Sequence, residues 1–334
     1  MFKLGVYRLE QYQDGAPATF AAAVRDRLSR NRISLQLFRA DVPAPARQVS
    51  LFEHALPLLR LSSGVYRTTF RGRFRDLDVF INDLLERHFG RTAALCLEDW
   101  AASDCLTSTE WAASLADRFP NARLTASDLT LFLIEASLPG GEAFILEASG
   151  APLQYIRPPF VIRMNPPEPK LLAVNWLMGR RALGRLERLR RGWKLPEEWL
   201  AEEGGGDLAQ PPFMFRKIPL IHPEAQALRR ESDRFAIRKQ SVFEPAQEPC
   251  HAIRSMNIFN LAYFSAAQLA GGATAVWRSL APGGIWIVGR TFQENPPAHN
   301  ASAFVKQERG FRLLERYGKG SEIDEIVLGL AELC

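Results

Sequence analysis

The sequence predicts an α/β fold with a mainly parallel sheet, and three features of the chain favour it. Between residues 91 and 135, apolar segments of strand length flank a segment of helical period, an order typical of parallel sheets. A similar alternation returns after residue 236. A proline-rich and then basic stretch lies between them, so we expect one sheet whose strands come from both sides of an insertion.

Composition limits the class of protein. The 334 residues are 47% hydrophobic and 24% charged, which is typical of a globular chain with a sizeable core. There is no apolar leader and no run of about 20 uninterrupted apolar residues, so we expect a cytoplasmic protein without a transmembrane segment. Neither a disulfide framework nor a metal site is predicted, because no C-x-x-C pair is formed by Cys96, Cys105, Cys250 and Cys334.

The chain is expected to have four regions. They are a mostly helical N-terminal region, the first half of the α/β domain, an insertion and the second half of that domain, at residues 1–90, 91–150, 151–235 and 236–334. In the first region, residues 19–30 have helical spacing. A second helix is predicted from Asp76 to Gly90, with an acidic start, a glycine end and one apolar stripe of Val79, Phe80, Leu84 and Leu85.

A strand, a helix and a strand follow each other from residue 92 to residue 129, which is a βαβ unit of Rossmann-like type. Thr107 or Ser108 is expected to cap the helix. In such units the loop after the first strand passes close to a ligand, and an acid after the second strand binds ribose hydroxyls. Asp128 has the right spacing from the loop, and a carboxylate can accept two hydrogen bonds from a diol. The alternative is a solvated residue at a strand end.

The insertion is rich in proline and then basic. Between Lys170 and Lys194 there are eight Lys or Arg residues and one acid, Glu187. Residues 174–194 place leucine and arginine at helical spacing, which predicts an amphipathic helix with its arginines in water. Alternatively, the helix binds an acidic peptide or an anionic membrane; nucleic acid is unlikely because no known binding signature is present. We expect the segment to be a lid or substrate region.

In the second half of the α/β domain, the sequence predicts a strand that enters a loop at residues 251–264 and a helix at residues 268–280. A turn follows at Pro282–Gly284, where glycine supplies a positive φ, and then a buried strand at residues 285–291. The final segment, residues 311–330, is expected to form two short strands.

These segments resemble class I S-adenosylmethionine-dependent methyltransferases, most closely the chemotaxis-receptor glutamate methyltransferases. WAASDCLTSTEW (100–111) is similar to that family's Ala-Cys-Ser-Thr-Gly-Glu-Glu loop and helix, and TASDL (125–129) to its Ala-Thr-Asp strand end. SMNIFNLAYFS (255–265) is similar to its Arg-Asn-Val-Leu-Ile-Tyr-Phe element, and LAPGGIWIVGRT (280–291) to its Leu-x-Pro-Gly-Gly strand. The matches cover about residues 91–135 and 240–292.

The resemblance implies a class I methyltransferase sheet and S-adenosylmethionine as cofactor. Asp128 would hold the ribose. Asn257 would lie beside the amino-acid part of the cofactor or the reacting methyl group, or its side-chain amide caps the loop. Asp99 either contacts the cofactor's amino group or is a helix-capping or surface residue. Asp104 either faces the sulfonium or is an exposed turn residue. The implied cofactor-binding set is Asp99, Trp100, Ala101, Ala102, Ser103, Asp104, Asp128, Leu129 and Asn257.

Methyl transfer is an in-line displacement with a neutral leaving group, so it needs mainly alignment. An ionised carboxylate nucleophile needs no base, whereas a hydroxyl or amine does. The catalytic candidates are Asn257, Tyr263 and His251, although His251 is also compatible with a structural role and Tyr263 with a place in the core. Cys105 stands where the resembled family has glycine, and Met256 where the receptor methyltransferases have arginine.

Two hypotheses follow for the whole chain. The first is methyl transfer to an unidentified small-molecule or peptide substrate, with an acidic one favoured by the basic insertion. The alternative is a catalytically silent methyltransferase-like subunit that binds a protein partner. A nicotinamide-dependent oxidoreductase is a third and weaker option, because the chain lacks G-x-G-x-x-G.

Overall fold

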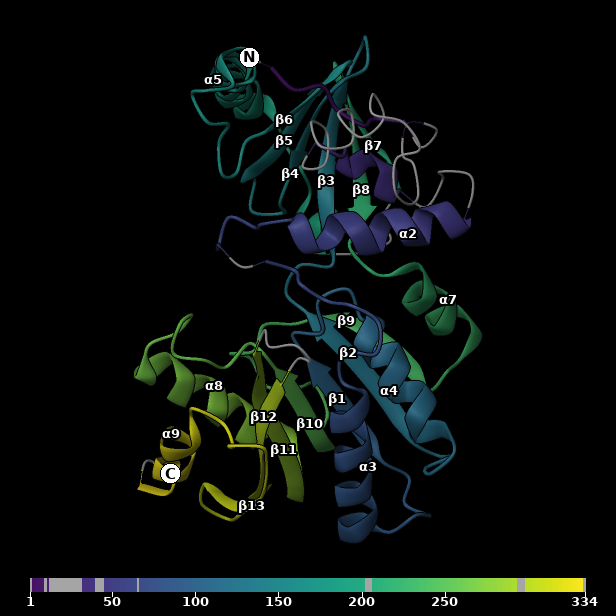
Figure 1. The fold of residues 1–334 in the computed structure, drawn as a ribbon, viewed down its shortest axis with the longest axis vertical. Helices are drawn as coiled ribbons and strands as arrows, with labels where there is room; N and C mark the ends of the chain where they lie inside the picture. The colour runs from purple at the N-terminus through teal and green to yellow at the C-terminus, as the bar shows by residue number, and fades with distance from the viewer. Residues whose placement is uncertain are drawn as a thin grey trace. The chain divides into compact units, whose positions relative to one another are not determined.

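The computed structural model describes residues 2–8, 11, 32–39, 45–64, 66–201, 206–292 and 298–332. The helix expected at residues 19–30 lies outside the described residues. Two compact units make up the chain, and both are drawn in Figure 1. The first combines Met1–Thr68 with Thr130–Pro223, and the second combines Thr69–Leu129 with Glu224–Cys334. Among the described residues, no helix is long and apolar enough to span a bilayer.

The second unit is the predicted α/β domain. It contains a seven-stranded sheet in the order β13-β12-β11-β10-β1-β2-β9. Five strands of this sheet, namely β1, β2, β9, β10 and β11, pair in parallel. The remaining two, β12 and β13, extend the sheet through antiparallel pairs. The bounds are β1 (Cys96–Trp100), β2 (Arg123–Asp128), β9 (Phe235–Lys239), β10 (Cys250–Met256), β11 (Leu280–Phe292), β12 (Ala298–Lys306) and β13 (Phe311–Tyr317).

The parallel pairing of β1 with β2 confirms the predicted βαβ unit, with Leu97 opposite Leu124. From β1 the chain winds outward in one direction through β2 to β9. From β10 it winds the other way, to β11. The strand order therefore reverses between β1 and β10. In open α/β sheets, ligands bind beyond the carboxyl ends of the strands at such a switch point.

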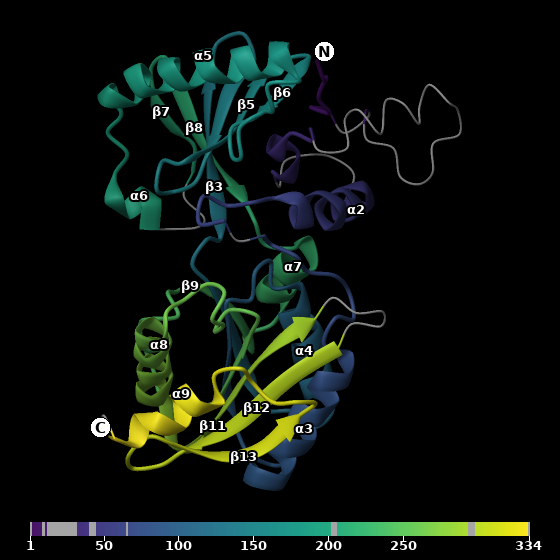
Figure 2. The same cartoon turned by 60° about the vertical axis from the view of Figure 1, so that its left-hand side comes forward.

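Helices cover both faces of this sheet, with α8 on one side and α3 and α4 on the other (Figure 2). The apolar core on the α8 side is built around Trp100, Trp286 and Phe304. A capping box of Ser265 and Gln268 starts α8. The helices are α3 (Arg75–Phe89), α4 (Leu106–Ala116), α7 (Pro223–Glu231), α8 (Ala266–Ser279), α9 (Asp324–Leu328) and the 3-10 turn η5 (Gly329–Glu332).

Two details of the predicted helices are wrong. Val79 is half exposed, because the buried face of α3 joins the predicted Leu84 and Leu85 to Leu77 and Ile81. This face also includes polar residues that have buried partners. The N-cap of α4 is Cys105, not Thr107 or Ser108, and the hydroxyl of Ser108 donates to Asp99.

The C-terminal segment also departs from the prediction. It forms one strand, β13, followed by α9, rather than two strands. The partner of β13 is β12, a strand that the sequence did not predict. A Cβ on Gly289 of β11 would lie 2.2 Å from the carbonyl oxygen of Asn300 in β12, so the close approach of these two strands requires glycine.

The first unit contains a six-stranded antiparallel sheet in the order β6-β5-β4-β3-β8-β7. Its strands are β3 (Phe132–Leu138), β4 (Glu142–Leu146), β5 (Pro152–Arg157), β6 (Phe160–Arg163), β7 (Leu208–Gln210) and β8 (Phe213–Pro219). Its helices and 3-10 turns are η2 (Leu35–Phe38), α2 (Pro45–Ala55), η3 (Leu56–Leu58), α5 (Ala173–Leu189), η4 (Arg190–Gly192) and α6 (Glu197–Ala201).

This sheet shifts the expected domain boundaries. Residues 130–150, which the sequence assigned to the parallel domain, form a hairpin of β3 and β4 in the antiparallel sheet. Gly140 and Gly141 both have positive φ in the connecting turn, and a tight turn can only join antiparallel strands. The inserted segment therefore begins at Thr130, and residues 1–68 belong to the same unit.

The predicted amphipathic helix in the insertion is confirmed as α5. It buries Asn175, Gly179, Ala182 and Leu186, at helical spacing, and packs against β6. The packing is close at Gly179, where a Cβ would lie 3.3 Å from the Ile162 side chain. The expectation that this segment is a lid concerns the relation between the two units, and it stays a prediction.

Candidate functional site

The loop between β1 and α4 has an unusual backbone. Ala101, Ser103 and Cys105 have φ values of 57°, 59° and 64°. This left-handed region costs about 1–2 kcal/mol for a residue with a Cβ. Hydrogen bonds fasten the loop to the end of β2: the Ala102 amide donates to the Ser127 carbonyl, and the Ser103 amide to Asp128 Oδ2, both at 2.9 Å.

The loop after β10 has the same feature at Asn257, whose φ is 67°. Its amide donates to the Gly289 carbonyl of β11 at 2.8 Å. The side-chain oxygen accepts a hydrogen bond from the Thr291 amide at 2.7 Å. Asn257 therefore holds the loop to the end of the neighbouring strand through both its backbone and its side chain.

These strained positions are concentrated in one place. Among the described residues, every non-glycine residue with positive φ lies in the loops after β1 and β10, namely Ala101, Ser103, Cys105 and Asn257. The two strands are paired neighbours, so both loops lie at the switch point of the sheet. Strained backbone persists only where the surroundings hold it, and it is concentrated at ligand and active sites.

Asp128 ends β2 at the same edge of the sheet and is half-buried. Its carboxylate accepts from the Ser103 amide, and its carbonyl accepts from Gln240 at 3.1 Å. The structure therefore brings together the loop after β1, the acid after β2 and Asn257. Leu129 follows Asp128 and is largely exposed.

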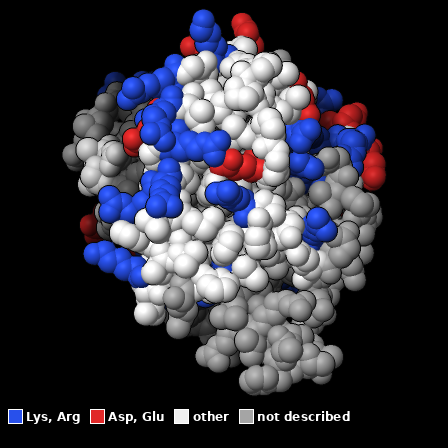
Figure 3. All heavy atoms as spheres, turned by 90° about the horizontal axis from the view of Figure 1, so that it is seen from above, with Lys and Arg blue, Asp and Glu red and all other residues white. Residues whose placement is uncertain are grey.

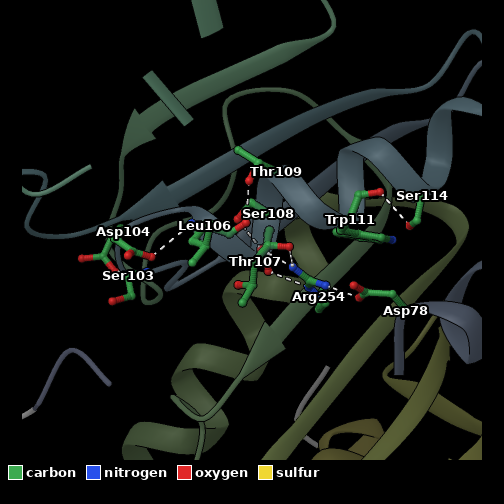
Figure 4. Close-up of polar contacts among 12 residues, drawn as sticks. Asp78, Ser103, Asp104, Leu106, Thr107, Ser108, Thr109, Trp111, Ser114 and Arg254 are labelled. Carbon is green, nitrogen blue, oxygen red and sulfur yellow. Dashed lines mark hydrogen bonds and ion pairs between the residues drawn. The ribbon is translucent and has the colours of Figure 1, made fainter. Parts of the chain in front are cut away.

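Asp99 has a different position from the one expected, because its side chain is buried in an ion-pair cluster. Its Oδ1 accepts from Arg254 Nε at 2.9 Å, and its Oδ2 accepts from Ser108 Oγ at 2.6 Å. Figure 4 shows the Arg254 side chain pointing toward Asp78 as well, and this guanidinium lies 4.3 Å from the ring centre of Trp111. Both Asp99 oxygens have protein partners, so this carboxylate has a structural role in the cluster.

Burial and charge act against each other in this cluster. Burial lowers the pKa of Arg254, but the charges of Asp99 and Asp78 outweigh it, so its pKa lies above the ordinary value. Burial raises the pKa of Asp78 to about 7, although Arg254 opposes this shift. One guanidinium thus faces two carboxylates in this buried cluster.

Trp100 and Asp104 are also buried, and Asp104 is therefore not an exposed turn residue. The Trp100 indole donates to Glu98 Oε2 at 3.0 Å within the core. Asp104 Oδ1 accepts from the Leu106 amide at the start of α4, at 3.1 Å. Burial lowers the pKa of Arg73, and the charge of Asp104 opposes this shift. A buried carboxylate thus lies in the strained loop.

The catalytic candidate His251 lies at the wrong edge of the sheet. Its Nδ1 accepts from the amide of Cys96, the first residue of β1, at 3.0 Å. Four residues of strand, or about 13 Å, separate Cys96 from the carboxyl end of β1. His251 packs against Phe89 and has a structural role. Tyr263 is at the correct edge, in the loop after β10, and is half exposed rather than part of the core.

The structure adds His299, which the sequence did not single out. It lies near the start of β12, opposite Thr291 at the end of β11. Since β12 runs antiparallel, its amino end reaches the carboxyl edge of the parallel strands. His299 Nδ1 lies 3.1 Å from Thr291 Oγ1, and burial lowers the pKa of the imidazole. Sequence reasoning missed it because β12 was not predicted.

Comparison with known proteins gives structural neighbours only. No family model and no curated protein matches the chain. It is similar to the sugar N-methyltransferase KedS8 from Streptoalloteichus sp., with 12% identity, 81% of this chain and 87% of that chain covered, and a TM-score of 0.32. The amino pentose methyltransferase CalS10 from Micromonospora echinaspora has 10% identity, coverages of 72% and 67%, and a TM-score of 0.29.

A third similar structure is the [4+2]-cyclase SpnF, with 10% identity, coverages of 66% and 47%, and a TM-score of 0.29. The resemblance to the receptor methyltransferases stays a prediction. The strand order, the parallel pairing and the covering helices identify the second unit as a Rossmann-like α/β domain.

Proposed function

We propose that this chain is an S-adenosylmethionine-dependent methyltransferase whose cofactor binds at the carboxyl ends of β1, β2 and β10. The observation that carries the proposal is the cluster of strained loop residues at the switch point of the sheet, beside the carboxylate of Asp128. A loop held in this way presents backbone groups at a fixed position, and binding is strongest when its groups are preorganised.

The residues present fit this cofactor. The carboxylate of Asp128 suits the ribose diol. The backbone of residues 101–105 forms the side of the site nearest β1, and Asn257 forms the side nearest β10. Asp104, which is buried in the loop and bonded to the Leu106 amide, would add negative charge to this side of the site, and that charge would favour a cationic sulfonium. When bound, the cofactor supplies an activated methyl group, and the role of the protein is to align the nucleophile with it.

For the proton, we propose His299 in place of His251. Its imidazole is partly buried at the same edge of the sheet, and burial favours the neutral form, which is the form that accepts a proton. The neighbouring Thr291 hydroxyl holds the ring in position. This arrangement fits a substrate that attacks through a hydroxyl or an amine, both of which must lose a proton.

Titration calorimetry with S-adenosylmethionine tests the proposal. We expect micromolar binding by the unaltered protein. Asp128→Ala should weaken it by about 1–3 kcal/mol, because the ribose loses its acceptor and the Ser103 amide loses its partner. Asp117→Ala is the matched control, since Asp117 is exposed after α4. Failure of the unaltered protein to bind at millimolar ligand would refute the proposal, and equal affinity of both variants would move the ribose elsewhere.

A further inference from the structure

The outer face of α5, in the antiparallel-sheet unit, combines two kinds of exposed side chain. The first turn carries an apolar patch, which we define as Leu171, Val174 and Leu177 with Phe2 and Leu4. The rest of the helix and the turn after it carry a basic band, which we define as Arg180, Arg181, Arg188, Arg190, Arg191 and Lys194. The methyl-transfer site proposed above is built without either group.

The apolar patch is exposed and is held in place by hydrogen bonds. Leu171 is 75% exposed, and Val174 and Leu177 are each more than 40% exposed. Asn175 ties the N-terminal segment to the helix, because its Oδ1 accepts from the Lys3 amide at 2.8 Å and its Nδ2 donates to the Lys3 carbonyl at 2.9 Å. The exposed Phe2 and Leu4 on either side of Lys3 are thereby held beside the first turn of α5.

The basic band is strongly unbalanced in charge. From Lys170 to Lys194 the chain has eight Lys or Arg residues and one acid, a net charge of +7. Arg185 is paired with Glu142, and the members of the band defined above are exposed. Figure 3, which looks down on this unit, shows Lys and Arg side chains gathered in a band on one side with few acidic ones among them.

The inner face of α5 is already packed against the sheet, so a partner must approach the outer face. We propose that this face binds an anionic lipid surface. Apolar side chains enter the boundary between headgroups and acyl chains, while arginines and lysine reach the lipid phosphates. Nucleic acid would use the arginines but offers no apolar environment for Leu171, Val174 and Leu177.

The basic band should provide most of the affinity. A basic residue near an anionic membrane strengthens partitioning roughly fivefold, so a triple neutralisation weakens it roughly a hundredfold. Val174, Leu177, Arg181 and Arg188 repeat at three, four and seven residues along the helix, so they share one face. Because charge provides most of the affinity, we expect binding to be shallow and reversible, and to weaken with salt as the charges are screened.

Co-sedimentation with vesicles tests the proposal. The full chain should bind vesicles with about 30% phosphatidylglycerol in phosphatidylcholine, and not phosphatidylcholine alone. The variant Arg181→Gln, Arg188→Gln, Arg191→Gln should lose roughly a hundredfold in partitioning. It leaves Arg180 in place because that residue lies over Trp176. The matched control is Arg123→Gln, Arg309→Gln, Arg312→Gln, which removes the same charge from exposed positions of the other unit.

A second variant, Leu171→Ser, Val174→Ser, Leu177→Ser, tests insertion. It should weaken binding to anionic vesicles while the remaining binding stays sensitive to salt. Several outcomes overturn the proposal: no binding to anionic vesicles, equal loss in the control variant, or binding to single- or double-stranded nucleic acid without binding to vesicles. Association of two copies that the serine variant abolishes, with no vesicle binding, assigns the face to a dimer instead.

Discussion

Arg254 is a buried cation between two buried carboxylates, Asp99 and Asp78. Its position on β10 links the sheet to α3 and to the start of α4. Because β10 and α4 adjoin the strained loops, the buried cluster holds the frame of the candidate site. Removing one partner from such a cluster leaves a buried charge uncompensated, which typically costs about 3–5 kcal/mol.

Asp78 should make stability depend on pH. The pKa of Asp78 is raised by burial to about 7 in the folded chain, against an ordinary value of 3.8. The unfolded chain therefore releases the proton first as the pH rises, and the free energy of unfolding falls between pH 4 and pH 7, by up to about 1.4 kcal/mol per pH unit. Urea unfolding at several pH values measures this change.

The variant Asp78→Asn is the control for that experiment, because its side-chain oxygen still accepts from Arg254 but cannot titrate. The difference between the two proteins isolates Asp78 from other groups such as His299, whose lowered pKa acts in the opposite direction. An identical pH dependence in the variant contradicts the assignment.

His299 has its own measurable signature. Burial lowers the pKa of its imidazole below the ordinary 6.5, so the ring should be neutral at pH 7. NMR of the ring nitrogens should show the neutral form, with the signal assigned through His299→Asn. A charged imidazolium at pH 7 would exclude His299 as the proton acceptor proposed here.

At the scale of elements, β11 and β12 hold the edge of the site. Gly289→Ala should destabilise the protein by about 2 kcal/mol or more, because the new Cβ meets the backbone of Asn300 and Ala301. It should also release Asn257, whose amide donates to the Gly289 carbonyl. Gly271→Ala in α8 has open space around it and should instead stabilise by about 0.5–1 kcal/mol. Urea denaturation compares the two variants, and equal stabilities would be inconsistent with the tight strand contact.

The elements also show what could be predicted from the sequence. Strands β1 and β2 and helix α4 follow from apolar runs and helical period, and Asp128 and Asn257 follow because they end predicted strands. The hairpin of β3 and β4 was assigned to the wrong sheet, because a continuous apolar run does not distinguish a strand of a parallel sheet from a buried strand of an antiparallel sheet. The position of His251 follows from the start of a predicted parallel strand, whereas His299 could not be found because β12, whose antiparallel direction brings it to the site, was not predicted.

At the scale of the whole molecule, each unit is built from two stretches of chain that are distant in sequence. The α/β unit places the strained loops and Asp128 together, and the antiparallel unit carries the apolar patch and the basic band on α5. The positive charge is therefore uneven along the chain, and the net value of +5 for all residues understates the local value of +7 between Lys170 and Lys194.

The division of the chain has a consequence for its synthesis. Residues 130–223, which are 94 residues of the antiparallel unit, are made between β2 and β9. At about 5–20 residues per second, the ribosome takes roughly 5–20 seconds to cover that stretch. During this time β1 and β2 have left the ribosome without β10, the strand that completes the switch point. The candidate site is therefore among the last parts of the protein to assemble, after its neighbour has had time to fold.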